Sequence, residues 1–144
     1  MKTPSISTLQ PVVLPPTYTT TTAPESFPDS SYGTLAWHTL FSHPHTPTRD
    51  LIAGLAVCPP NTGHLCAHRH AQAEIYYIVQ GDGEVTIDGR RWTVTAGSTV
   101  YIPPNSEHEI ANTGTADLRW FYVFPTSSFG DVVYRFSKDE KAKL

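Results

Sequence analysis

Short apolar segments separated by turn residues are the feature of this sequence that most limits how the chain can fold. From Asp50 onward, segments rich in valine, isoleucine, threonine and aromatic residues alternate with turns built from glycine, proline and asparagine. Strands that recur about every 8 to 12 residues are typical of a β-sandwich or barrel, and no window has the apolar period of an amphipathic helix. We therefore expect one all-β barrel unit, with strands at residues 35–41, 51–58, 74–80, 84–88, 91–95, 99–102, 107–112 and 117–124.

The N-terminal third of the chain differs in composition from the rest. The first 48 residues hold eight of the 13 prolines and only three charged residues, so they cannot form a continuous helix or a central strand. This segment is either a disordered tail or an extended arm that lies on the domain or on a neighbouring subunit and buries Ile6, Leu9 and residues 12–14. We favour a partly ordered arm that contributes little to the core. The predicted units are an arm at 1–32, a barrel at 33–136 and a polar, helix-compatible tail at 137–144.

Charge and cysteine content disfavour several classes of function. Ten basic and 13 acidic residues give a formal charge of −3, and 16% of residues are charged, so we expect no nucleic-acid partner. The apolar stretches are far shorter than the roughly 18 residues of a membrane helix, and prolines interrupt the N-terminus where a secretory signal would be apolar. We therefore predict a cytoplasmic protein without membrane association, in which Cys58 and Cys66 are free thiols.

Three histidines and one glutamate have the spacing of a metal site. His68 and His70 are two residues apart, so on a strand both rings point to the same face. Glu74 opens the next expected strand and His108 lies at the start of a later one, so all four side chains can meet inside a barrel. Three imidazoles and a carboxylate suit iron, manganese, zinc, nickel or cobalt, and contain too much nitrogen for magnesium or calcium. An isolated His-x-His pair is more often an ordinary core or surface feature, so the surrounding residues decide the interpretation.

The residues around these four candidates resemble the two sequence motifs of the cupin family. The segment Gly63-x4-His68-x-His70-x3-Glu74-x6-Gly81 is similar to the first motif, and Gly97-x5-Pro103-x-Asn105-x2-His108-x3-Asn112 is similar to the second. The first motif is one residue short between Gly63 and His68. Asn105 stands where the family usually has glycine, and asparagine tolerates the same left-handed backbone conformation.

This resemblance implies a fold and a cofactor but leaves the reaction open. A cupin is a small jelly-roll barrel, usually part of a homodimer, that encloses one divalent transition metal. The ligands implied here are His68, His70, Glu74 and His108. Cupins include dioxygenases, decarboxylases, isomerases, lyases and binding proteins, so the fold alone is a weak guide to chemistry.

A closer likeness points to one group of cupins. Residues 68–76 and 124–134 resemble single-domain cupin lyases that cleave dimethylsulfoniopropionate. In those enzymes the metal binds the substrate carboxylate, and a tyrosine two residues after the ligand glutamate removes the α-proton. Tyr76 occupies that position here. Phe121 stands where those lyases have a second tyrosine, although Tyr122 is adjacent, and the long N-terminal arm is a further departure.

Aromatic residues are the candidates for binding a substrate. Alternation from Glu74 directs Tyr76 toward the barrel interior with the ligands. Aromatic residues from several strands could form a pocket with Tyr76 for an onium or planar small molecule. These residues are Trp37, Tyr101, Trp120 and Tyr122. For any one of these side chains, ordinary filling of the barrel is the simpler interpretation.

Three functional hypotheses follow. The first is a metal-dependent lyase that acts on a small carboxylate, with the metal as Lewis acid and Tyr76 as base. The second is an iron or manganese dioxygenase that uses the same four ligands. The third is a protein that binds a small molecule without catalysis. Oxygen dependence of turnover separates the first two, and the absence of any turnover favours the third.

Overall fold

The computed structural model describes residues 9–142 of the chain. The first eight residues of the predicted arm, Ile6 among them, and the last two residues of the predicted tail lie outside the described residues. Within the described part, strands and their connecting turns account for most of the chain, and the expected all-β class is confirmed. No helix in residues 9–142 is long and apolar enough to cross a membrane.

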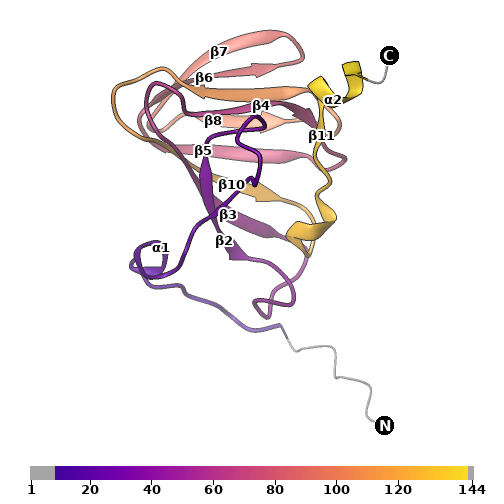
Figure 1. Ribbon diagram of the computed structural model, residues 1–144. Helices are drawn as coiled ribbons and strands as arrows, with labels where there is room; N and C mark the ends of the chain where they lie inside the picture. Colours follow the sequence, from indigo (N-terminus) through magenta and orange to yellow (C-terminus); the bar gives the residue numbers. More distant parts are fainter. Residues whose placement is uncertain (1–8, 143–144) are drawn as a thin grey trace.

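Two antiparallel sheets lie against each other and enclose the core (Figure 1). One sheet has six strands in the order β1 (Glu25–Ser26), β2 (Ala36–Phe41), β3 (Ile52–Cys58), β10 (Leu118–Phe124), β5 (Glu74–Gln80) and β8 (Thr99–Ile102). The other has five strands in the order β11 (Arg135–Phe136), β4 (His64–Arg69), β9 (His108–Asn112), β6 (Asp82–Ile87) and β7 (Arg90–Thr95). Of the eight predicted strands, β5 and β8 have the expected bounds, and the other six differ by one or two residues at their ends. Strands β1, β4 and β11 were not among the predicted strands.

Alternation of side chains along each strand decides what enters the core. On β10, Trp120, Tyr122 and Phe124 face inward and are almost completely buried. The sequence pattern put these three residues on one face without deciding which face it was. On β5, Tyr76 and Ile78 face inward, as expected from the position of Glu74.

Helical structure is short and lies outside the two sheets. A single turn, α1 (Tyr18–Thr21), interrupts the arm, and a 3-10 turn, η1 (Phe129–Asp131), follows β10. The helix α2 (Ser137–Ala142) lies in the tail for which a helix-compatible sequence was noted. Neither of the two earlier turns has the apolar periodicity by which a helix is found in a sequence.

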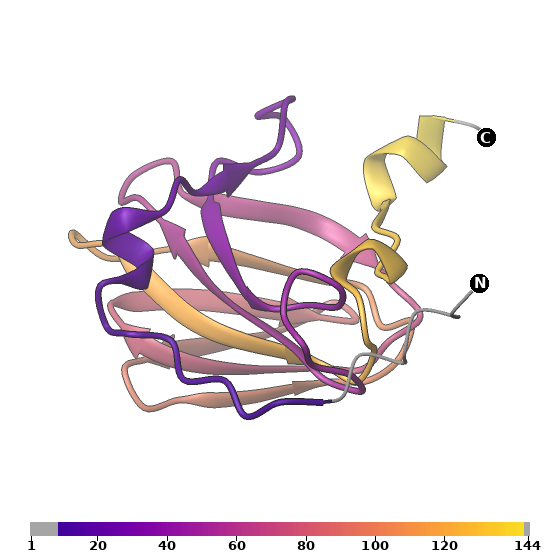
Figure 2. The same ribbon diagram turned by 90° about the horizontal axis from the view of Figure 1, so that it is seen from below.

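The N-terminal arm is ordered over its described length and contributes to the core, which differs from our expectation. It passes around the outside of the strands before it reaches β1 (Figure 2). Strand β1 pairs with β2, and the ring of Phe27 then lies 5.0 Å from that of Trp37 and 5.7 Å from that of Phe136 (ring centroids). A proline-rich segment can still bury single aromatic residues, because side-chain packing needs no hydrogen-bonded backbone. Further upstream, Val13 is 93% exposed.

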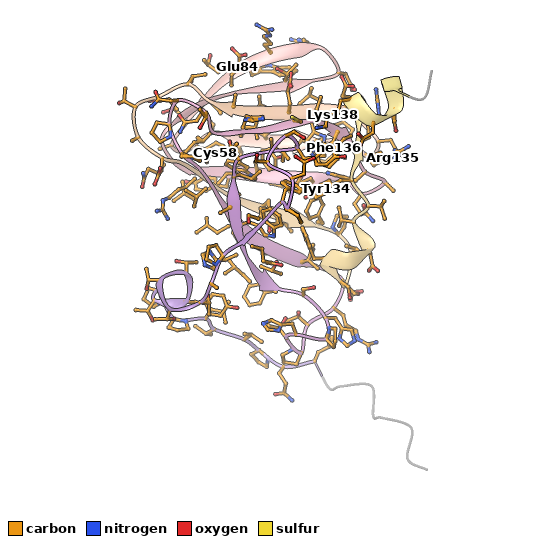
Figure 3. All side chains as sticks on the ribbon, in the orientation of Figure 1. Cys58, Glu84, Tyr134, Arg135, Phe136 and Lys138 are labelled. Atoms are coloured by element: carbon orange, nitrogen blue, oxygen red, sulfur yellow. The ribbon has the colours of Figure 1, made fainter. Side chains whose placement is uncertain are left out.

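The C-terminal segment joins the two sheets. After β10 the chain makes the turn η1 and returns as β11, which pairs with β4 so that Phe136 lies opposite His68. In Figure 3, Tyr134 and Phe136 lie toward the space between the sheets, whereas Arg135 points outward. This return was not predicted, because a two-residue strand has too little pattern to be recognised in a sequence.

Candidate metal centre

Four buried side chains meet between the two sheets. His68 on β4 lies opposite His108 on β9 in the strand register, His70 follows directly after β4, and Glu74 is the first residue of β5. Each of the four residues is at most 4% exposed. The structure thus brings together all four of the residues expected to form a metal site. Glu74 reaches the cluster from the opposite sheet.

Backbone carbonyl groups set the orientation of the three imidazole rings. The Nδ1 of His68 donates to the carbonyl oxygen of Cys66 at 2.7 Å, and those of His70 and His108 donate at 2.9 Å to the carbonyls of Gln72 and Ser106. A carbonyl oxygen can only accept, so in each ring the proton is on Nδ1. In a neutral ring, Nε2 then keeps its lone pair, which is the form in which histidine binds a metal. Nε2 of His70 also lies within hydrogen-bond distance of the Glu74 carboxylate.

The Nε2 atoms converge on one point beside the carboxylate. One ring nitrogen from each of His68, His70 and His108 lies within 4.8 Å of the others. The Oε1 atom of Glu74 is 3.2 Å from Nε2 of His70 and 3.3 Å from Nε2 of His108. This arrangement of three nitrogens and one oxygen could hold one metal ion.

Two of these nitrogens lack any hydrogen-bond partner, although they are buried. The Nε2 atoms of His68 and His108 have no partner with acceptable geometry. A buried acceptor without a partner costs roughly 1–3 kcal/mol, and proteins rarely keep one without a function. A metal that accepts their lone pairs removes this cost, and the donor set suits iron, manganese, zinc, nickel or cobalt. The residues present therefore fit a divalent transition metal.

Burial and neighbouring charges also shift the pKa of two side chains at the site. Burial lowers the pKa of His68 well below its usual value, and the neighbouring His108 and His70 lower it further. The ring therefore stays neutral and able to bind a metal at neutral pH. Burial raises the pKa of the Tyr76 hydroxyl, and the negative charge of Glu74 raises it further.

A small cavity of about 20 Å³ adjoins the cluster at Glu74, which is the one candidate ligand among its lining residues. Of the aromatic residues expected around a substrate, Tyr76, Trp37, Trp120 and Tyr122 line this cavity together with Glu74. The Nε1 of Trp37 and the hydroxyl of Tyr122 are buried and have no hydrogen-bond partner.

The expectation for Tyr101 is wrong. Its side chain is 63% exposed and lies on the outer face of β8, opposite Ile75 of β5 in the register. Ile75 is next to Glu74 on β5, so its side chain points to the opposite, outer face of the sheet. Its register partner Tyr101 must therefore also point away from the interior.

Three cavity-lining aromatic residues were not predicted, which are Phe27, Phe129 and Tyr134. The ring of Tyr134 lies 4.9 Å from that of His68 and 5.6 Å from that of His70 (centroids). Tyr134 ends the second segment of similarity to the cupin lyases, and that similarity was the one signal in the sequence that could have drawn attention to it. Phe129 lies in the same segment of similarity, whereas Phe27 lies in no motif and in no strand with a recognisable pattern.

Asn105 joins the second motif to the C-terminal segment. Its φ of 62° is the left-handed conformation expected for the position where cupins usually have glycine. The backbone N–H of Asn105 donates to the carbonyl of His70, its own carbonyl accepts from Arg69, and its side-chain oxygen accepts from Arg135 at 2.9 Å. One turn residue thus links the metal-ligand turn to β11.

Comparisons with known proteins agree with this architecture. The family described as the cupin domain matches residues 54–124. The dimethylsulfoniopropionate lyase DddW of Ruegeria pomeroyi is 39% identical over 110 residues, which are 76% of this chain and 70% of that protein. Gentisate 1,2-dioxygenase 1 of Aquipseudomonas alcaligenes is 35% identical over 75 residues, 51% of this chain and 21% of that protein. The crystal structure of a cupin-like protein from Thermotoga maritima has the same fold, with a TM-score of 0.65, 17% identity and coverage of 85% of this chain and 95% of that one.

Proposed function

Because the chain belongs to the cupin family, we propose that it is a metal-dependent lyase that cleaves a small onium carboxylate by β-elimination. The observation that carries this proposal is the convergence of three imidazole nitrogens and the Glu74 carboxylate next to a small aromatic cavity that Glu74 and Tyr76 both line. The similarity to a dimethylsulfoniopropionate lyase supports the choice of a lyase and names the first substrate to test.

His68, His70, Glu74 and His108 are the proposed ligands of one divalent transition metal. Their side chains are oriented before any metal binds, because backbone carbonyls hold the three rings and the strand register places Glu74 against them. When bound, the metal supplies positive charge that lowers the pKa of a neighbouring phenol and stabilises negative charge on the substrate carboxylate as the α-proton leaves.

Tyr76 is the proposed base. It lies one strand period after Glu74, and both line the same cavity. In its phenolate form, Tyr76 takes the α-proton, and the electron pair of that C–H bond forms the carbon–carbon double bond. The bond between Cβ and the leaving group then breaks, and its electron pair leaves with the neutral leaving group. From dimethylsulfoniopropionate the products would be acrylate and dimethyl sulfide.

Aromatic side chains are proposed to hold the positively charged end of the substrate. Rings of Trp37, Trp120, Tyr122 and Tyr134 line the cavity, and neither lysine nor arginine is among its lining residues. An onium group over an aromatic face is stabilised by about 0.5–2 kcal/mol, and more strongly where water is excluded. The substrate is thereby oriented with its carboxylate toward the ligand cluster.

A substrate assay with and without oxygen tests this function. The protein, loaded in turn with each of the five candidate metals, is incubated with dimethylsulfoniopropionate in air and under anaerobic conditions. We expect equal amounts of acrylate and dimethyl sulfide in both atmospheres. Failure to release either product with any of the metals would refute the lyase proposal for this substrate.

A dioxygenase is the second candidate, because the same donor set suits iron and a gentisate dioxygenase is among the similar proteins. Turnover that consumes oxygen in proportion to product would favour it. If a metal-loaded protein binds small carboxylates but turns none of them over, a non-catalytic binding function takes the place of both.

A further inference from the structure

The inner cavity is too small for any substrate that an elimination reaction requires. Its volume of about 20 Å³ accommodates a single water molecule, which needs about 10–15 Å³ measured in the same way. A molecule with a carboxylate and a leaving group is several times larger. At least one wall of the cavity must therefore move to admit a substrate.

A much larger pocket of about 640 Å³ lies on the other side of one of these walls, between the arm, β2 and η1. Phe129 lines both the inner cavity and this outer pocket, and no other lining residue of the two is shared. The side chain of Phe129 therefore separates the metal-site cavity from a pocket that opens to solvent.

Hydrogen bonds hold the backbone of Phe129, whereas its ring is held by packing alone. Its N–H donates to Oγ of Ser42 at 2.9 Å, and Ser128 and Asp131 form a reciprocal capping interaction across the turn. The ring centroid lies 6.3 Å from the rings of Trp37, Tyr122 and Phe124 and 6.4 Å from that of Tyr134, toward the long end of the range for aromatic pairs. The side chain is only partly buried, so a passage past it needs rotation of the ring and no movement of the backbone.

The outer pocket has the chemistry to attract a cation. The carboxylate of Glu25 lies in its wall and accepts hydrogen bonds from the hydroxyl of Thr39 at 2.6 Å and from its N–H at 3.3 Å. The ring of Tyr18 lines the same pocket, and neither lysine nor arginine does. A carboxylate together with aromatic rings selects small organic cations over anions.

We infer that the outer pocket is a first binding site for small molecules that carry a positive charge, and that Phe129 is the side chain that admits them to the metal-site cavity. The inference rests on the proposed function for the identity of the natural substrate. The passage itself can be tested without turnover, because two tryptophans, Trp37 and Trp120, line the inner cavity.

Fluorescence quenching measures access to this cavity. Replacing the exposed Trp92 by Phe leaves Trp37 and Trp120 as the fluorophores, and acrylamide serves as a neutral quencher. We expect Phe129→Ala to raise the quenching constant about threefold or more and Phe129→Leu to raise it less. The matched control is Leu65→Ala, which enlarges the same cavity away from the outer pocket and should leave the constant unchanged. The passage at Phe129 is refuted if Phe129→Ala has no effect or if Leu65→Ala has an equal one.

The charge preference is tested with two ionic quenchers in the Phe129→Ala background. We compare the ratio of two quenching constants, that of the cation N-methylpyridinium divided by that of iodide. This ratio should be higher for the protein than for free tryptophan. Glu25→Gln should lower this ratio about fivefold, since one carboxylate at close range contributes on the order of 1 kcal/mol in water. The exposed Glu109 of β9 lies outside the pocket, so Glu109→Gln is the control and should not change the ratio. An unchanged ratio in Glu25→Gln refutes the cation site.

The quenching experiments and the lyase assay can fail separately. If both quenching tests give the expected results but the lyase assay releases no product, the proposed function is refuted and the passage at Phe129 stands.

Discussion

Three imidazole rings in the site share one hydrogen-bond arrangement. In each, Nδ1 donates to a carbonyl two residues away along the chain, and Nε2 points to the common centre. At the scale of single residues, the site is therefore prepared by the local backbone, and the energetic cost of orienting the ligands is met on folding. Substitutions here should affect metal binding more than the fold, because the strands around the site bury enough apolar surface without it.

The ligand assignment can be tested with single alanine substitutions. His68→Ala and His108→Ala should each remove most of the bound metal, while the far-ultraviolet circular dichroism spectrum stays that of the unaltered protein. Metal content after purification is the measurement. His64→Ala is the control, because the Nδ1 of His64 also bonds a carbonyl two residues away, that of Thr62, but the residue is not part of the cluster. Full metal occupancy in either ligand variant would contradict the assignment.

The role of Tyr76 can be separated from its packing. Tyr76→Phe removes one oxygen and keeps the buried ring, so metal content and melting temperature should barely change. If the hydroxyl is the base, turnover should fall on the order of 10²–10⁴-fold. Tyr77→Phe is the matched control, because Tyr77 is the next residue on β5 and points to the outer face. Turnover close to normal in Tyr76→Phe would remove the main reason to prefer a lyase.

Cys58 should make stability fall at alkaline pH. Burial raises the pKa of the Cys58 thiol from about 9 to about 12. The unfolded chain loses this proton near pH 9 while the folded protein keeps it, so the contribution to stability is present below pH 9 and is lost as the pH rises toward 12. Urea unfolding between pH 8 and 10 measures the change, whose limiting slope is about 1.4 kcal/mol per pH unit. Cys58→Ala should flatten this slope, and an equally steep slope in that variant would contradict the assignment.

At the scale of secondary-structure elements, the C-terminal segment packs against the candidate metal site. Strand β11 has two residues, yet its pairing with β4 brings Tyr134 and Phe136 onto the ring of His68. So short a pairing is supported by side chains on either side of it. Arg135 bonds Asn105 in the turn before β9, and the ring of Tyr32 in the arm lies 4.3 Å from that of Phe136.

Asn105 offers a test of this element that separates backbone strain from a side-chain bond. Asn105→Ala loses the bond to Arg135 and also replaces asparagine by a residue that tolerates the left-handed conformation less well, so the free energy of unfolding should fall by about 1–2 kcal/mol. Asn105→Gly loses the same bond but adopts this conformation freely, and should cost less. Urea denaturation measures both variants. Equal losses in the two would show that backbone conformation does not matter at this turn.

At the scale of the whole molecule, the outer face of the six-stranded sheet stands out. Strand β5 exposes about half of Ile75, Tyr77 and Val79, and β8 exposes Tyr101 beside them. Monomeric proteins rarely expose contiguous apolar surface of this kind without a partner. We propose that a second copy of the chain covers this face in a symmetric dimer. The arm could extend such a contact, because Val13 is almost fully exposed near β2 and β3.

Sedimentation equilibrium tests the dimer. The unaltered protein should sediment with twice the mass of the chain, and Tyr101→Glu should shift it to the monomer without loss of metal, because a charge on each copy would be buried in the contact. Val133→Glu places the same charge on an exposed apolar residue of the C-terminal segment and should leave the dimer intact. A monomeric unaltered protein, or a dimeric Tyr101→Glu protein, would contradict the proposal.

Local rules of the sequence determined the strands and the four candidate ligands. Alternation is a property of neighbouring positions, so the inward parity of Tyr76 followed from that of Glu74. The left-handed turn at Asn105 was expected from the resemblance to the second cupin motif. For Tyr101, Phe27, Phe129 and Tyr134, the tertiary structure alone decided whether the residue lines the aromatic cavity. Strand register turned Tyr101 outward, and the return of the chain after η1 carried Tyr134 to His68, 66 positions earlier in the sequence. Such contacts depend on how distant segments pair, and no local pattern records that pairing.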